Sequence, residues 1–342
     1  MSAGHANGWK VPAAGLAVLA GLCLAAVARG AEIRNVTAKQ RYPWNGLVDI
    51  RFSVSGIGEG EAWALSLAAL EPDSGSVREV SHFRVVRDGT DPDERAVSAN
   101  GECEVLWDAA ADLGEVVCSN MVVQVAFWEH PMFQLWEGGP YWADRNVGAE
   151  EPWESGHYFW WGDTTGFLWE DEQWVATDGS VTGYSFTGTN TPTQMVQLGK
   201  LQSQGWITED GVLAPGADPA QVQWGGGWRM PTTQELSALI DNCEWIWTTT
   251  NGAKGYVVRG RDGHASASIF LPLAGWGNGT LLDRVGKYGY FWAADPDSSL
   301  TNPRSWRLIL RPNDKIYMDY FYDRYVGTSC RPVRGGAERQ SP

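Results

Sequence analysis

The stretch Trp224-Gly-Gly-Gly-Trp-Arg-Met-Pro-Thr-Thr-Gln-Glu-Leu236 decides the fold of the second half of this chain. Its run of glycines indicates a loop, because glycine adopts backbone conformations that other residues avoid. Thr232 is followed three residues later by Glu235, the spacing of a capping box, so a helix is predicted to begin near Thr233. The apolar face of that helix consists of Leu236, Leu239, Ile240 and Cys243. The helix is therefore expected to direct the Cys243 side chain toward a core.

Residues 1–30 have the pattern of a secretory signal peptide. Lys10 precedes an apolar run from Val11 to Val27, and small residues that suit signal peptidase surround Ala28. A membrane anchor is the alternative, but the apolar run is short and rich in Ala and Gly. We expect the segment to be cleaved, which leaves no transmembrane segment, and the protein to be secreted or associated with the cell envelope.

The charge balance argues against one class of partner. The chain has 26 basic and 41 acidic residues, a net charge of −15. Cleavage would remove Lys10 and Arg29, leaving 24 basic residues and a net charge of −17. Nucleic-acid binding depends on clustered Lys and Arg that neutralise phosphates, so this composition disfavours it.

Length and composition indicate two domains rich in β structure. About 310 residues after cleavage exceed what a single core usually holds. The 20 tryptophans and 41 glycines are typical of a loop-rich protein packed with aromatic rings. A helical bundle is excluded on this ground.

Four cysteines remain after cleavage: Cys103, Cys118, Cys243 and Cys330. In an exported chain they indicate two disulfides, and four cysteines allow three connectivities. The pairs Cys103–Cys118 and Cys243–Cys330 are preferred, because each then lies inside one domain. A zinc site is the alternative, but the chain has no CxxC or paired-histidine spacing to support it.

The first domain, residues 31–130, is predicted to be an immunoglobulin-like β-sandwich. Its apolar residues alternate with polar ones, and Gly, Asp, Pro and Ser clusters separate the runs. A linker is expected at 131–139, a second domain at 140–334 and a polar tail at 335–342. The predicted strands of the first domain are 47–54, 64–67, 83–86, 103–107 and 121–127.

The second domain is expected to combine helices with strands. Besides the helix at Thr233, a second helix is predicted to begin at Pro192 with Thr191 as its cap. Runs of β-branched and aromatic residues between Gly- and Asp-rich loops predict further strands. These lie at 255–259, 267–271, 289–293, 305–310 and 329–333.

Segments of the second domain resemble the Fibrobacter succinogenes major paralogous domain, a C-type-lectin-like module of exported bacterial proteins. In the first domain, 41–50 resembles a module that precedes sulfatase-modifying-factor-like domains. The first resemblance implies two helices flanking a mixed, mostly antiparallel sheet whose first and last strands pair. It also implies a Cys243–Cys330 bond joining the helix to the last strand. The matching segments are 141–148, 156–163, 224–247, 251–256, 268–275, 290–292 and 328–333.

Relatives with this fold are of two kinds, calcium-dependent lectins and formylglycine-generating or iron enzymes. The chain lacks the Glu-Pro-Asn, Gln-Pro-Asp and Trp-Asn-Asp signatures of the lectin calcium site, which leaves Asp283, Asp295 and Asp297 as weak calcium candidates. The enzymes need a cysteine pair near the C-terminus or a histidine cluster. Only Cys330 lies near that end, and the histidines have no ligand spacing. We therefore expect no catalytic residue and no cofactor, with calcium as the open alternative.

Aromatic residues provide the remaining indication of function, because flat indoles stack on the apolar faces of sugar rings. The alternative for each ring is a place in the core. We expect a non-catalytic protein that binds a polysaccharide or a surface protein through loops near 160–175 and 275–304. An enzyme of the formylglycine-generating type and a structural envelope protein are the alternatives. The candidate ligand-binding residues are Trp160, Trp161, Trp169, Trp174, Trp276 and Asn278.

Overall fold

The chain folds into two compact units, Met1–Met132 and Phe133–Pro342. Strands account for 47% of the protein and helices for 13%, in several antiparallel sheets, so the fold is mainly β as predicted. The computed structural model describes residues 9–10, 31–42, 45–71, 76–86, 95–114, 121–128, 130–194, 196–297, 303–313 and 315–335. Most of the predicted signal peptide and polar tail, together with Cys118 of the predicted Cys103–Cys118 bond, lies outside these residues.

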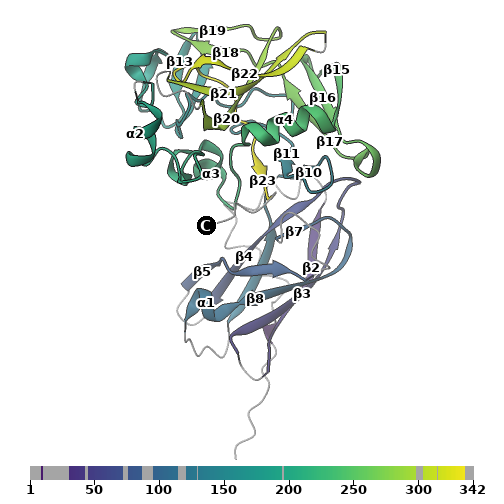
Figure 1. The fold of residues 1–342 in the computed structure, drawn as a ribbon. Coiled ribbons are helices and arrows are strands. Elements are labelled where there is room, and N and C mark those ends of the chain that lie inside the picture. Colours follow the sequence, from purple (N-terminus) through teal and green to yellow (C-terminus); the bar gives the residue numbers. More distant parts are fainter. Residues whose placement is uncertain are drawn as a thin grey trace, which may run out of the picture. The chain divides into compact units, whose positions relative to one another are not determined.

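The first unit consists of two antiparallel sheets around one core (Figure 1). The alternation of apolar and polar residues explains why strand β3 (Leu47–Ser55) packs one face against this core. Its inward residues Val48, Ile50 and Phe52 are buried and alternate with more exposed ones. A short helix, α1 (Ala109–Leu113), follows the first sheet's β8. In sheet order, the strands are β1 (Trp9–Lys10), β2 (Glu32–Gln40), β3, β8 (Gly101–Asp108) and β6 (Phe83–Val85), and then β5 (Ser76–Val80), β4 (Trp63–Glu71) and β7 (Ala96–Val97), with β9 (Val122–Phe127) on β4.

The described residues of the second unit form five small sheets and three α-helices. Within the predicted second domain, residues 140–334, the first strand pairs with the last, Tyr141 with Arg334 and Trp142 with Val333, which confirms that prediction. The sheets are β10 (Met132–Gln134), β11 (Tyr141–Ala143) and β23 (Val333–Arg334); β12 (Phe167–Glu170), β13 (Gln173–Ala176) and β14 (Thr182–Tyr184); β15 (Glu244–Thr250), β16 (Ala253–Arg259) and β17 (Ser268–Pro272); β18 (Trp276–Asn278) and β19 (Leu281–Asp283); and β20 (Gly289–Pro296), β21 (Arg304–Arg311) and β22 (Lys315–Asp323). The helices are α2 (Leu198–Ser203), α3 (Pro219–Trp224) and α4 (Thr233–Asn242).

Strands β20 and β21 separate two cores, because successive side chains of a strand point to opposite faces. On one face lies the α4-side core, which contains Leu236, Leu239, Tyr256, Phe291 and Leu308. On the other lies the loop-side core, which contains Phe159, Trp161, Trp276, Trp292 and Ile309.

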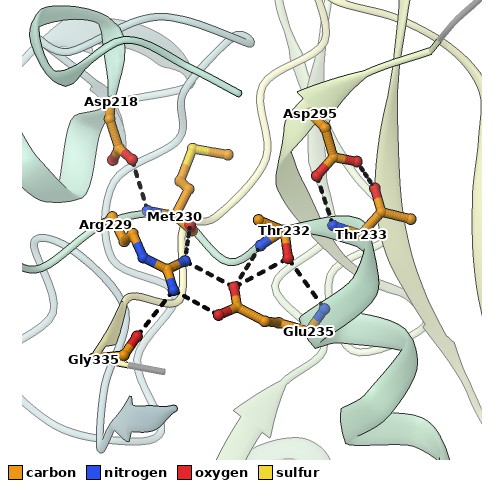
Figure 2. A network of polar contacts seen from close by, with 8 residues as sticks. All are labelled: Asp218, Arg229, Met230, Thr232, Thr233, Glu235, Asp295 and Gly335. Atoms are coloured by element: carbon orange, nitrogen blue, oxygen red, sulfur yellow. Dashed lines mark hydrogen bonds and ion pairs between the residues drawn. The ribbon is translucent and has the colours of Figure 1, made fainter. Parts of the chain in front are cut away.

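A capping box starts α4 as predicted, and Figure 2 shows the polar network around it. The Thr232 hydroxyl accepts from the Glu235 N–H, and the Glu235 carboxylate accepts from the Thr232 N–H. The Arg229 guanidinium forms two hydrogen bonds to that carboxylate, of 2.7 and 2.5 Å, and donates to the carbonyl of Gly335. The Arg229 backbone also exchanges two hydrogen bonds with Val333. One arginine thus connects the glycine loop, α4 and the final strand.

Helix α3 was not predicted, although its start follows the same capping rules. The Asp218 carboxylate accepts from the N–H groups of Ala220 and Gln221, and Pro219 occupies the first turn. The other oxygen of Asp218 accepts from the Met230 N–H at 2.8 Å (Figure 2). Asp218 therefore fixes α3 against the segment that leads into α4.

The helix predicted to begin at Pro192 is wrong, because α2 begins at Leu198. The Arg324 guanidinium takes the carbonyls of Thr193 and Val196 as its acceptors, at 3.1 and 2.8 Å. Those carbonyls are the ones a helix starting at Pro192 would have used for its own first turns. A buried arginine from the far end of the sequence therefore overrides the local helix signal.

The predicted linker at 131–139 is also wrong for most of its length. Residues 133–139 belong to the second unit, and Leu135 is fully buried in the α4-side core. The ring of Trp136 packs 6.3 Å from that of Trp142. Glycine and proline breaks in this segment therefore mark a packed loop.

The predicted Cys243–Cys330 disulfide is absent, because both residues are free thiols. Cys243 ends α4 and packs in the α4-side core, whereas Cys330 packs in the loop-side core. Burial raises the pKa of the Cys243 thiol to about 12 and that of Cys330 well above its ordinary value. The positions of the two cysteines in the sequence do not show that their side chains enter different cores.

We predict that Glu235→Ala lowers the free energy of unfolding of the second unit by roughly 3–5 kcal/mol, because it leaves Arg229 in a largely buried site without its carboxylate. Urea unfolding followed by tryptophan fluorescence measures the effect. Glu244→Ala is the matched control: it breaks an exposed pair with Arg259 at 3.8 Å, which is worth about 0–1 kcal/mol. Equal losses in the two variants would contradict the assigned role of the network.

Both thiols of the second unit should resist alkylation in the native protein and react after unfolding without a reductant. Burial excludes the reagent and keeps the sulfurs protonated, and the thiolate is the reactive species. Peptide mass spectrometry after iodoacetamide treatment, with and without denaturant, reads out Cys243 and Cys330 separately. Labelling that requires a reductant as well as a denaturant would show that the disulfide forms after all.

Candidate functional site

The β12–β13 and β18–β19 hairpins of the second unit carry several of the predicted site residues, among them Trp169, Trp174 and Trp276. The segment after β14 joins the β18–β19 hairpin through Phe186 and Gly279, which exchange backbone hydrogen bonds of 2.9 and 3.0 Å. The Phe186 ring lies between Gly277 and Gly327, and a Cβ atom on either glycine would come within 2.6 Å of it. Only glycine fits at these two positions, so the glycines set the distance between the hairpins.

Three of the five candidate tryptophans belong to the core and do not offer a stacking face. Trp161 and Trp174 are fully buried, and Trp276 is buried in the loop-side core. The Trp161 indole donates to the carbonyl of Ala293 at 2.9 Å. The alternative reading, that these rings fill the interior, is therefore correct for Trp161, Trp174 and Trp276.

Trp169 and Trp160 are partly exposed. Trp169 stands at the end of β12, with its ring centroid 4.9 Å from that of Trp174 in an edge arrangement. Trp160 packs edge-on against Trp206 at 6.2 Å. We call two sets of residues on the neighbouring hairpins the hairpin surface: Trp169, Glu170, Asp171 and Glu172 on β12–β13, and Asn278, Leu281 and Leu282 on β18–β19, where Leu282 packs on the same core as Trp169 and Asn278 and Leu281 lie on the opposite face.

The turn between β12 and β13 has a strained backbone. Asp171 and Glu172 both have positive φ angles, 48° and 61°. A two-residue hairpin turn requires this conformation, but Asn-Gly or Gly-Gly adopts it at far lower cost. Asp is also among the residues favoured at the first of these positions, so only Glu172 occupies a position at which the backbone favours glycine.

The three calcium candidates do not form one site. Asp283 is exposed and lies 3.3 Å from the Arg284 guanidinium. The Asp295 carboxylate instead caps α4, accepting from the N–H and hydroxyl of Thr233 (Figure 2). Asp297 is buried near Arg324. Within the described ranges, no three Asp, Glu, His or Cys residues cluster with metal-binding geometry.

A ladder of arginines and aromatic rings crosses one face of β20, β21 and β22. The Arg307 guanidinium lies 4.3 Å above the Tyr290 ring, and the rings of Trp276 and Tyr290 stack at 5.1 Å. At the other end, Arg284 and Arg311 lie over Tyr288. We call this set the arginine–aromatic ladder; it consists of Trp292, Arg307, Trp276, Tyr290, Tyr288, Arg284, Arg311 and Tyr317.

Sequence reasoning missed this ladder, although a signal was present. Arg307 lies between apolar residues in the predicted strand at 305–310, and Arg311, four residues later, directly follows that predicted strand. A period of two places both arginines on one face of the strand. Only the sheet register shows that Tyr288, Tyr290 and Tyr317 share that face.

Asp163 organises the loop that carries Trp160. Its carboxylate accepts from the N–H groups of Thr165 and Gly166, both at 3.1 Å. Burial raises the pKa of Asp163 to about 7, and the backbone hydrogen bonds only partly offset this. The side chain of Gln223, on α3, donates to the carbonyl of Thr165 at 2.9 Å, which fastens the loop to that helix.

Comparison with known proteins gives no relatives: no family profile, curated protein or solved structure matches this chain. Among the described residues, no helix is long and apolar enough to cross a membrane. The site's chemistry must therefore be argued from its own residues.

Asp163 should make the second unit less stable as the pH rises from about 4 to about 7. In this window the native carboxyl holds a proton that the unfolded chain has released, so folding becomes less favourable with each increase in pH. Asp163→Asn should weaken this dependence, leaving the contribution of Asp218, whose pKa burial raises to about 6, and urea unfolding at pH 5, 6, 7 and 8 measures the change. Asp210→Asn, at an exposed position, is the control that should keep the wild-type slope. Parallel pH profiles for wild type and Asp163→Asn would contradict the raised pKa.

Proposed function

We propose that this protein is an exported, non-catalytic binding protein that recognises a polysaccharide through the hairpin surface of its second unit. In this proposal the second unit is a C-type-lectin-like domain of the major paralogous type. The first unit is an immunoglobulin-like module that displays it. The resemblances in the sequence support these assignments, and the pairing of β11 with β23 agrees with the lectin-like connectivity.

The observation that carries the proposal is the partly exposed Trp169, which packs against the same small core as Leu282 of the neighbouring β18–β19 hairpin. An indole face stacks on the apolar face of a pyranose ring. The Asn278 amide, which is exposed on the adjoining hairpin, can both donate to and accept from sugar hydroxyls. Leu281 is 64% exposed and extends the apolar area. These groups come from two hairpins whose spacing Phe186 fixes.

The strained turn supports the same surface. Strained backbone persists where the surrounding structure holds it, and it gathers at binding sites. Asp171 and Glu172 place carboxylates at the hairpin tip, next to Trp169. Carboxylates and amides accept hydrogen bonds from sugar hydroxyls, so the acidic tip is consistent with a carbohydrate ligand.

An enzyme of the formylglycine-generating type is the alternative from another class. Such chemistry needs accessible thiolates or a metal held by them. The thiols of Cys243 and Cys330 are buried in separate cores with raised pKa values, which favours the binding role over this one. A structural envelope protein without a soluble ligand is the third possibility, and the experiment below separates it from the proposal.

Thermal unfolding across a panel of plant, algal and bacterial polysaccharides, with calcium or with a chelator, tests the proposal. A ligand that binds the native state raises the midpoint of unfolding. We expect at least one polysaccharide to do so, and Trp169→Ala to abolish the rise. Trp247→Ala is the matched control, because Trp247 is also partly exposed but lies on β15.

If the rise in the unfolding midpoint requires calcium, Asp283, Asp295 and Asp297 would again be candidate metal ligands. Absence of any shift across the panel, or an unchanged shift in Trp169→Ala, would falsify recognition through the hairpin surface. Each variant's unfolding is also measured without ligand, so that a loss of binding is distinguished from a loss of folding.

A further inference from the structure

The open end of the arginine–aromatic ladder has the features of an anion-binding site. The guanidinium carbons of Arg284 and Arg311 lie 4.7 and 4.8 Å from the centroid of one ring, that of Tyr288. Arg311 also lies 5.3 Å from the centroid of Tyr317. Arg284, Tyr288, Arg311 and Tyr317 are all partly or fully exposed, unlike Arg307 at the buried end.

Further positive charge surrounds this pair. Lys315 is the cross-strand partner of Arg311, and Lys287 precedes Tyr288. Lys254 approaches the adjacent turn, with its Cδ 4.0 Å from where a Cβ of Gly286 would lie. All three lysines are exposed. Five basic residues thus gather in one place on a chain whose net charge is −15.

Little negative charge in the described residues balances this cluster. Asp283 contacts Arg284 at 3.3 Å, but both side chains are well exposed, so the pair is weak. The Nε of Arg311 is buried without an acceptor, and Arg311 has no ion-pair partner in the described part of the chain. The faces of the Tyr288 ring attract both guanidiniums. They do not remove the repulsion between two like charges held at one ring, which a bound anion would offset.

The backbone at Arg284 adds an independent observation. Arg284 has a φ of 64°, a left-handed conformation that is unfavourable for a residue with a long side chain. Glycine would adopt it without cost. The position therefore carries a guanidinium at the expense of backbone stability, as is common where a side chain serves binding.

We infer that Arg284, Tyr288 and Arg311 bind an acidic sugar, a pyranose unit that carries a carboxylate, within a polysaccharide. The planar guanidinium matches a carboxylate in two parallel hydrogen bonds. The partly exposed ring of Tyr317 offers an apolar face for the sugar ring, whereas the Tyr288 ring holds the two guanidiniums in place. This inference rests on the proposed function and names its substrate class.

The arrangement of β19 connects this site to the hairpin surface. Leu281 begins β19, and Arg284 directly follows its end, a distance of roughly 10 Å along an extended strand. Leu281 and Asn278 belong to the hairpin surface, whereas Arg284 belongs to the ladder. One polysaccharide chain can therefore contact Leu281 of the hairpin surface while a carboxylate on it meets the arginines.

Binding of polygalacturonate, measured by calorimetry beside its fully methyl-esterified form, tests the inference. The two polymers share a backbone and differ in the carboxylates. We expect the esterified form to bind at least roughly tenfold more weakly, because hydrogen bonds between charged groups are lost. Arg284→Gly and Arg311→Gln should reduce polygalacturonate binding by a similar factor, and Arg311→Lys should restore only part of it.

The controls separate charge, strain and folding. Arg284→Gly relieves a left-handed arginine, so its unfolding midpoint should equal or exceed that of the wild type. Asn251→Gly makes the same backbone change at a φ of 45° in another turn, and Arg259→Gln removes one exposed positive charge from β16. Both should leave polygalacturonate binding unchanged.

Equal binding of the two polymers, or full binding by Arg284→Gly and Arg311→Gln, would overturn the inference. If Trp169-dependent binding of a neutral polysaccharide persists in that case, the proposed function stands without the acidic-sugar site. Dextran sulfate forms the last arm. Two results together would show a general attraction of polyanions and would also overturn the inference. They are that dextran sulfate binds as strongly as polygalacturonate, and that Arg259→Gln weakens dextran sulfate binding as much as the substitutions of Arg284 and Arg311 do.

Discussion

The structure of the second unit depends on the interactions of Arg229. Its guanidinium forms a two-point contact with Glu235 at the start of α4, and its backbone pairs with Val333 in the final strand. Glu235 in turn completes the capping box with Thr232. Because the pair is largely buried, each charge needs the other to offset the cost of its desolvation. The loop, the helix and the C-terminal strand are therefore fixed as one group.

Strand β20 connects this group of residues to the arginine–aromatic ladder. The carboxylate of Asp295, on that strand, accepts a hydrogen bond from the Thr233 N–H and so connects α4 to the sheet of β20, β21 and β22. The opposite face of the same sheet carries Tyr290 and Trp292 of the ladder. The ladder consequently lies on the same sheet that packs against α4, even though the residues that would meet a ligand lie in turns and short strands.

Sequence patterns predicted correctly those elements whose structure is determined by residues close together in the sequence. The capping box at Thr232 and the alternation at 47–54 each determine their own structure, and both predictions were correct. Two classes of feature could not be read in this way. The failed helix at Pro192 depends on Arg324, a residue distant in sequence, and the exposure of a tryptophan depends on which sheets meet. The segments near 160–175 and 275–304 contain the two hairpins, but their sequence did not separate core residues from surface residues.

The pairing of β11 with β23 has a consequence for the biogenesis of the protein. These strands come from opposite ends of the second unit, and Arg229 completes its contacts only when Val333 and Gly335 are in place. Contacts between distant parts of a chain form slowly, because the intervening loop must first close. A chain emerging N-terminus first can assemble its first unit early, but the second must wait for its last strand. Until then its many aromatic side chains remain exposed to other chains, which makes the interval before completion the period most vulnerable to aggregation.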